Sequence, residues 1–122
     1  MILLFEGNAG WRRIIADFLK QNGYEIILFD KLKTAQTAFY DKKSQIDIVI
    51  CGGGFPRQEK EDYLMGLWAK ELFLSKVKIL VISRNVIPMI GISFIDKNRF
   101  REDILKNSVE ELLNTKQVIS ID

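Results

Sequence analysis

Polar residues or glycines follow each of five short apolar runs, and they are the residues that could do chemistry. In chain order they are Glu6-Gly7-Asn8, Asp30, Gly52-Gly53-Gly54, Ser83-Arg84 and Asp96-Lys97. If the runs are parallel strands, these residues meet at the sheet edge where open α/β folds bind ligands. Carboxylates there could hold a metal ion, and an ammonium group or a nest of backbone N–H groups could hold an anion.

Several common chemistries are excluded by residues that the chain lacks. It contains no histidine, which removes the commonest metal ligand and general base and any Ser-His or Cys-His pair. Cys51 is the only cysteine and lies in an apolar run, so we expect a buried, inert thiol and no internal disulfide. We therefore expect no catalytic residues, no enzyme activity, no bound metal and no cofactor.

The elements that must position these residues alternate along the chain. Strands are expected at Ile2 to Phe5, Ile26 to Phe29, Ile46 to Cys51, Lys78 to Ser83 and Ile92 to Ile95. Helical spacing of apolar residues predicts helices around 11–19, 35–39, Arg57 to Phe73 and Asn98 to Asn114, the first ending at Asn22-Gly23. This alternation predicts an α/β fold, a three-layer, doubly wound parallel sheet with helices on both faces.

Composition and charge limit the class of protein. The 122 residues are 48% apolar and 28% charged, as expected for one packed domain, which we place at 1–116 with a tail or linker start at 117–122. The net charge of +2 is too small to indicate a nucleic-acid partner. No apolar stretch is long enough to span a membrane, and the amino terminus lacks the basic start of a signal peptide, so we expect a cytoplasmic protein.

Four segments resemble the receiver domains of two-component response regulators (CheY-like). Residues 11–15 with 18–24 look like the family's first helix and turn, and 47–56 is similar to its third strand and the following loop ending in proline. Residues 79–83 resemble the fourth strand with its terminal Ser or Thr, and Phe94-Ile95-Asp96-Lys97 matches the fifth strand with its aromatic residue and lysine. The resemblance covers nearly the whole chain and implies a five-stranded flavodoxin-like sheet of order 2-1-3-4-5.

The resemblance also implies which positions would carry the family's chemistry. An acidic pair after the first strand binds Mg²⁺, an aspartate after the third accepts the phosphoryl group, and a Ser or Thr and a Lys bind its oxygens. In this chain Glu6 and Gly7 occupy the acidic pair, Gly52 the acceptor position, and Ser83 and Lys97 the last two. Glycine can neither form an acyl phosphate nor contribute a metal ligand from its side chain. The resemblance thus implies a vestigial site, with Mg²⁺ binding weak or lost.

The spacing before Lys97 is a second departure from the family. Only 13 residues, 84–96, separate it from Ser83, and Pro88 lies among them. The family fits a helix here as well as loops, so we expect its fourth helix to be shortened or absent.

Two features of the strand-end edge allow more than one interpretation. The run Gly52-Gly53-Gly54, with Asn8 and Arg57, could form an anion-binding pocket, but a flexible turn is the plainer interpretation. Lys97 could bind a ligand anion or pair with Glu6, and we favour the pair.

The sequence also indicates a possible interface, although it does not identify the partner. The last strand and helix, including Phe94, Arg99, Arg101 and Glu102, form a possible interface, although a solvated helix face explains the charges equally well. Trp11 and Trp68 are expected to pack in the core.

Three hypotheses about function follow. The first is a pseudo-receiver module of a two-component or phosphorelay-type system, which binds a protein partner or itself without phosphorylation. The second is a sensor that binds a nucleotide or another anion in the vacated pocket. The third is a phospho-receiver with an unusual acceptor.

Overall fold

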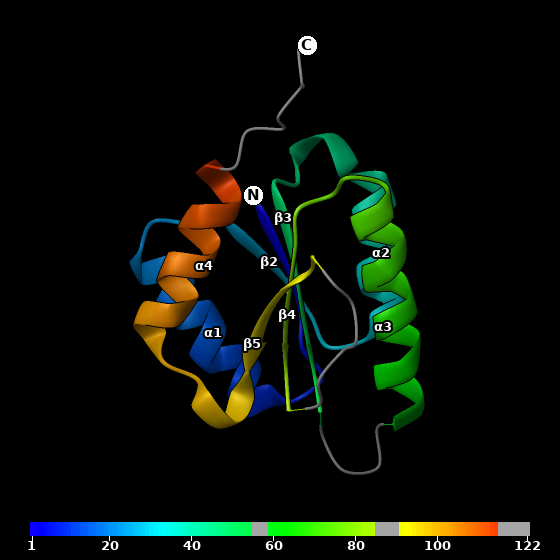
Figure 1. Ribbon diagram of the computed structural model, residues 1–122. Helices are drawn as coiled ribbons and strands as arrows, with labels where there is room; N and C mark the ends of the chain where they lie inside the picture. Colours follow the sequence, from blue (N-terminus) through cyan, green and yellow to red (C-terminus); the bar gives the residue numbers. More distant parts are fainter. Residues whose placement is uncertain (55–58, 85–90, 115–122) are drawn as a thin grey trace.

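Five parallel strands form one sheet in the order β2-β1-β3-β4-β5 (Figure 1). The computed structural model describes residues 1–54, 59–84 and 91–114. The strands are β1 (Ile2–Phe5), β2 (Ile26–Phe29), β3 (Ile48–Gly53), β4 (Ile79–Ser83) and β5 (Ser93–Asp96). The predicted fold class, sheet order and alternation of strands with helices are confirmed.

Helices cover both faces of the sheet (Figure 1). α1 (Ala9–Gln21) and α4 (Glu102–Asn114) lie on one face, and α2 (Leu32–Asp41) and α3 (Glu59–Leu74) lie on the other. Two short 3₁₀ helices, η1 (Lys43–Gln45) and η2 (Lys97–Arg99), complete the described elements. Each face has its own apolar core, and the strands contribute alternate residues to the two cores.

Local signals explain how α1 begins and ends. The Asn8 side chain accepts a hydrogen bond from the Trp11 backbone N–H at 2.9 Å, which caps the first turn. After the last turn the chain turns through Gly23, whose φ of +84° favours glycine. Asn8, which we considered as part of a possible ligand pocket, therefore has a structural role in starting this helix.

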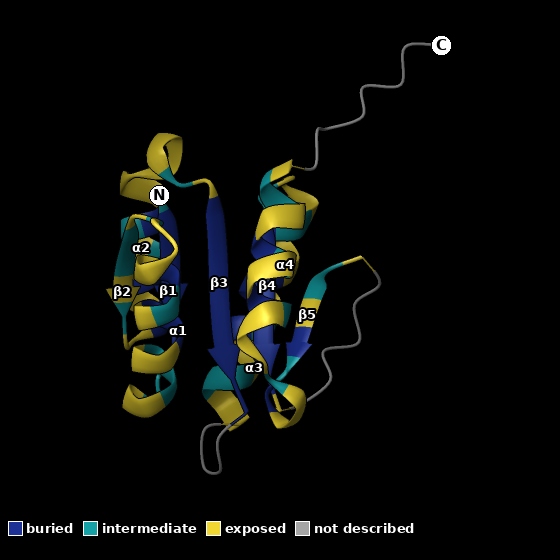
Figure 2. Cartoon of the chain, turned by 90° about the vertical axis from the view of Figure 1, so that its left-hand side faces the viewer, coloured by how far each residue is buried: buried dark blue, intermediate teal, exposed yellow. Residues whose placement is uncertain are grey.

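Burial is complete in the three central strands, as Figure 2 shows. Every residue of β1, β3 and β4 is buried, because helices cover both sides, whereas the edge strands β2 and β5 are partly exposed. The register pairs Phe5 with Cys51, Gly53 with Ser83, and Ser83 with Asp96. The residues that follow these strands therefore lie side by side at one edge.

The last helix begins later than the sequence predicted. At Asn98, where the sequence predicts the start of this helix, the chain forms η2 instead. The Asp96 side chain caps η2 by accepting a hydrogen bond from the Asn98 N–H at 2.9 Å. Phe100 is then extended, with ψ of 131°, and α4 starts at Glu102. The short capped turn keeps Lys97 directly at the end of β5.

Other predicted boundaries differ by a few residues. β3 runs two residues beyond Cys51, so Gly52 and Gly53 belong to the strand. The apolar spacing of α3 predicts that Leu64, Leu67, Trp68 and Leu72 share its inner side, and this prediction is wrong in part. Leu64 and Leu67 are exposed, and the buried row is Met65, Trp68, Ala69 and Leu72.

Nine residues, 84–92, connect β4 to β5, and 85–90 lie outside the described residues. A crossover between parallel strands ordinarily needs about ten to twelve or more residues if it contains a helix. The four α-helices that the structure describes all lie before β4 or after β5, so the predicted shortening or loss of the family's fourth helix concerns a segment that is mostly outside the described residues.

The residues from 115 onward also lie outside the described part, so the domain boundary at 116 stays a prediction. Among the helices that the structure describes, none is both long and apolar enough to cross a membrane.

Candidate functional site

A buried ion pair lies at the carboxyl edge of the sheet. Lys97 Nζ donates to Glu6 Oε1 at 2.5 Å, and both side chains are fully buried. Glu6 directly follows β1 and Lys97 directly follows β5, so the contact joins two strands that are separated in the sheet by β3 and β4. The predicted pairing of these residues is confirmed.

The Glu6 carboxylate occupies the space that a side chain at position 52 would need. A Cβ atom added to Gly52 would lie 1.8 Å from Glu6 Oε2 and 2.5 Å from Glu6 Cδ. Neither distance is possible between non-bonded atoms. Gly52 thus admits a carboxylate from the neighbouring strand and lets it reach Lys97.

A second carboxylate approaches the next glycine. The Asp62 Oδ2 atom accepts from the Gly54 N–H at 3.0 Å, and its Oδ1 atom lies 2.7 Å from the position of a Cβ on Gly53. Asp62 comes from the first turn of α3 and was not among the predicted site residues. The sequence holds only a weak signal for it, the acidic first turn Glu59, Glu61 and Asp62, which is also typical of an ordinary helix start.

Two successive glycines therefore make room for two carboxylates that face Lys97. This use of Gly53 and Gly54 argues against the anion pocket that we considered, because the Gly54 N–H already donates to the protein's own carboxylate. Gly54 also has φ of +93°, and a Cβ there would lie 2.5 Å from the Arg84 backbone nitrogen. Arg57, the remaining residue of that prediction, lies outside the described residues.

Aromatic rings and an arginine surround the ion pair. Lys97 Nζ lies 5.2 Å from the centre of the Trp11 ring, which packs edge-on against Phe100 with ring centres 5.2 Å apart. The Arg12 guanidinium donates from Nη1 to the Glu6 backbone oxygen at 2.9 Å. Trp11 is thus half-buried against the site, and Trp68 is buried in the other core, as predicted.

Burial shifts the pKa values of the three charged side chains Glu6, Asp62 and Lys97. Burial raises the pKa of Glu6 from 4.5 to about 7, although the hydrogen bond and charge of Lys97 act to lower it. The pKa of Asp62 is raised by burial and lowered in part by the Gly54 N–H. Burial lowers the pKa of Lys97, and Glu6 opposes that shift. At neutral pH the Glu6 carboxyl group is therefore close to its pKa.

One atom of the cluster lacks a partner in the part of the chain that is described. Glu6 Oε2 is buried and makes no hydrogen bond with those residues. A carboxylate oxygen only accepts unless the carboxyl group is protonated, so this atom would attract a donor or a cation and repel an anion.

The other predicted residues of the edge have simpler placements. Ser83 is buried at the end of β4, Gly7 is half-buried, and Asp30 is exposed. Within the described residues there is no group of three or more Cys, Asp or Glu side chains that could hold a metal ion. Cys51 is fully buried below the site, and burial raises the pKa of its thiol.

Comparisons with known proteins give structural matches only. No protein-family model matches the sequence, and no curated protein matches it. A solved response regulator receiver domain protein from Clostridium thermocellum superposes with a TM-score of 0.74 at 16% identity, covering 93% of each chain. The receiver domain of the hybrid histidine kinase CckA gives 0.70 at 21% identity, covering 92% of this chain and 97% of that one. The Vibrio cholerae chemotaxis protein CheY4 gives 0.70 at 16% identity, with the same coverage.

The chain has the receiver-domain fold. In this receiver fold the ion pair lies at the edge where ligands of open α/β sheets bind.

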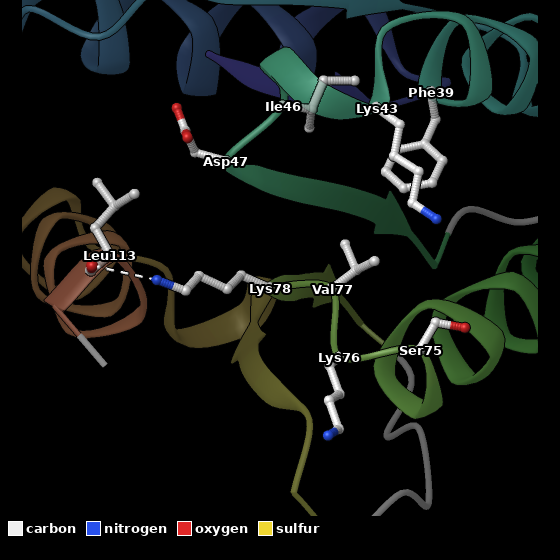
Figure 3. A pocket seen from close by; sticks show the side chains of 9 residues that line it. All are labelled: Phe39, Lys43, Ile46, Asp47, Ser75, Lys76, Val77, Lys78 and Leu113. Carbon is white, nitrogen blue, oxygen red and sulfur yellow. Dashed lines mark hydrogen bonds between the residues drawn. The ribbon is translucent and has the colours of Figure 1, made fainter. Parts of the chain in front are cut away.

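A separate pocket of about 440 Å³ opens at the opposite, amino-terminal edge of the sheet (Figure 3). Three lysines line it, Lys43, Lys76 and Lys78. Lys78 Nζ donates to the Leu113 backbone oxygen at 3.2 Å in the last turn of α4. Cations at such positions complement the carbonyl ends of helices, which accounts for these charges without a ligand.

The surface formed by β5, η2 and the start of α4 is open to solvent. Phe94, Arg99, Arg101 and Glu102 are all exposed, and Phe94 is 36% exposed. These residues are accessible to a partner, as the predicted interface requires.

Proposed function

We propose that this protein is a pseudo-receiver module of a two-component or phosphorelay-type system, which acts through protein–protein contacts without phosphorylation. The observation that carries the proposal is the Glu6 carboxylate, which fills the side-chain space of position 52 and binds Lys97. In a phospho-receiver that space belongs to the acceptor aspartate, and the lysine binds the phosphoryl oxygens. In this protein the Glu6 carboxylate fills that space and binds the lysine without any phosphorylation.

The residues at the edge support this proposal in two further ways. Gly52 has no carboxylate to phosphorylate, and Gly7 cannot supply the second acidic ligand to Mg²⁺. The remaining carboxylate, Glu6, is tied to Lys97 and its pKa is raised to about 7. We infer that Mg²⁺ binding is weak or lost and that the module needs no cofactor and performs no catalysis of its own.

The anion-sensor alternative has less support. The carboxylates of Glu6 and Asp62 lie beside Gly52 and Gly53, and Lys97 is already paired with Glu6. An incoming anion would have to displace a buried carboxylate, which would then need another partner.

Incubation with Mg²⁺ and acetyl phosphate, followed by intact-mass measurement, tests the proposal. We expect no added phosphoryl mass, while an authentic receiver domain treated in parallel gains it. A phosphorylated species at an Asp or Glu, located by peptide mapping, would overturn the proposal in favour of an unusual acceptor.

For the partner we propose a signalling protein that contacts the β5–η2–α4 surface through Phe94, Arg99, Arg101 and Glu102. All four are exposed, and an aromatic beside arginines is typical of interface anchors. We place the protein in the cytoplasm, where the receivers of such systems act.

A further inference from the structure

Large apolar side chains gather on the outer face of α2 and α3. Of the eight that are exposed among the described residues, five lie on these two helices, namely Tyr40, Tyr63, Leu64, Leu67 and Leu74, and we call them the α3 patch. Their exposed fractions run from 44% for Leu64 to 69% for Leu74. Single exposed apolar residues are ordinary, whereas a contiguous group commonly marks an interaction surface.

The patch is separate from the core-facing side of α3. Met65, Trp68, Ala69 and Leu72 already pack that helix against the sheet. Tyr63, Leu67 and Leu74 recur at intervals of four and seven, so they form a line along the opposite side of the same helix. Tyr40 of α2 joins the line through its hydroxyl, which hydrogen-bonds to Glu71 Oε1 at 3.3 Å. The helix therefore has apolar residues on two sides, and only one of these sides packs against the sheet.

Charges beside the patch favour a second copy of this chain as the occupant. Lys60 lies four residues before Leu64, and Glu71 lies four residues after Leu67. When two α3 helices pack antiparallel about a two-fold axis, one register places Leu64 of each copy against Leu67 of the other. The same register places Lys60 of each copy against Glu71 of the other. Both contacts form twice, so the surface is complementary to itself.

A parallel arrangement is disfavoured by the same residues. It would place Lys60 against Lys60 and Glu71 against Glu71, with the two helix dipoles aligned. The antiparallel arrangement opposes the dipoles and pairs unlike charges.

We propose that the α3 patch mediates homodimerisation through antiparallel packing of two α3 helices. This interface is distinct from the β5–η2–α4 surface, which stays accessible to a signalling partner. Five apolar side chains per copy are far fewer than the 20–30 residues per side of a standard interface, so the dimer is weak and forms in a concentration-dependent way.

Sedimentation velocity over a wide concentration series, from micromolar to millimolar, tests the proposal. The wild-type chain is expected to shift from monomer to dimer. Leu67→Glu is expected to raise the dissociation constant by about tenfold or more, because each dimer loses two leucine contacts and gains two buried acids. Ile14→Glu is the matched control: Ile14 is also 48% exposed on a helix, but α1 lies on the other face of the sheet. It is expected to leave the dissociation constant unchanged.

Charge reversal tests the register itself. Lys60→Glu and Glu71→Lys are each expected to weaken the dimer several-fold, and the double variant is expected to restore it, because the charges then pair again. Circular dichroism and thermal melts check that every variant folds, and both reversed positions are exposed. A wild-type chain that stays monomeric throughout the series would overturn the proposal, even if another protein bound the patch. Dimers unaffected by Leu67→Glu would also overturn it.

Discussion

At the scale of single residues, the relation between Gly52 and Glu6 decides the character of the site. A glycine at the end of a central strand ordinarily weakens the sheet, since it contributes no packing. Here it removes a clash, because Glu6 Oε2 lies where any side chain at 52 would begin. Gly52 in β3 and Glu6 directly after β1 therefore depend on each other structurally.

We expect Gly52→Ala to lower the free energy of unfolding by about 1–3 kcal/mol or more, since both the new methyl group and the displaced carboxylate are buried. Gly66→Ala is the matched control: nothing lies within 4 Å of a Cβ at this helical position. It should raise the free energy of unfolding by about 0.5–1 kcal/mol through better helix propensity. Urea denaturation measures both, and equal effects of the two substitutions would contradict this account.

At the scale of elements, α3 does three things at once. Its inner row packs on the sheet, its outer side carries four of the five residues of the α3 patch, and its first turn places Asp62 at the end of β3. The rotation of the helix about its axis fixes all three together. That rotation is set by the burial of Met65 and Trp68 rather than by the charged residues.

Asp62→Ala removes the acceptor of the Gly54 N–H and should cost about 1 kcal/mol of stability. Backbone amide exchange is expected to accelerate at Gly54, since the hydrogen bond that protects this N–H is lost. Asp17→Ala serves as control, because the Asp17 carboxylate is exposed and lies 3.7 Å from Arg13 in a surface ion pair. If Gly54 exchanged at the same rate in both variants, the role assigned to Asp62 would be wrong.

At the scale of the whole molecule, the ion pair links the strand ends of β1 and β5 in a sheet with a separate core on each face. Because the ion pair is buried, the protonation of Glu6 affects the free energy of unfolding of the whole domain. The folded protein raises the pKa of Glu6 to about 7, whereas an unfolded chain leaves it near 4.5. Between those pH values the folded state holds a proton that the unfolded state releases.

The Glu6 contribution to stability is therefore expected to be complete below pH 4.5 and to be lost as the pH rises through about 7. Glu6→Gln should remove this part of the pH dependence, since the amide does not titrate but still accepts from Lys97. Asp30→Asn, which neutralises an exposed strand-end acid, should retain it. Denaturant titrations across this range measure the slopes, and a Glu6→Gln slope equal to that of wild type would contradict the shift.

The sequence by itself determined the sheet and the residues at its edge. Buried strands such as Ile79–Ser83 are continuous apolar runs, and parallel crossovers bring the residues after each strand together, so Glu6 and Lys97 were predictable as a pair. Helix faces were harder to predict, because α3 is apolar on two sides and periodicity could not say which side was buried; Leu64 and Leu67 were misplaced for this reason.

Only the tertiary structure decided what fills the space beside Gly52 and Gly53. The absence of a side chain is visible in the sequence, but its replacement depends on rotamers and on the rotation of α3, which carries Asp62 from nine residues along the chain. Long-range packing fixes both quantities, and no local pattern encodes them. Gly52 was therefore predictable as a missing carboxylate, and the carboxylates of Glu6 and Asp62 beside Gly52 and Gly53 were visible only in three dimensions.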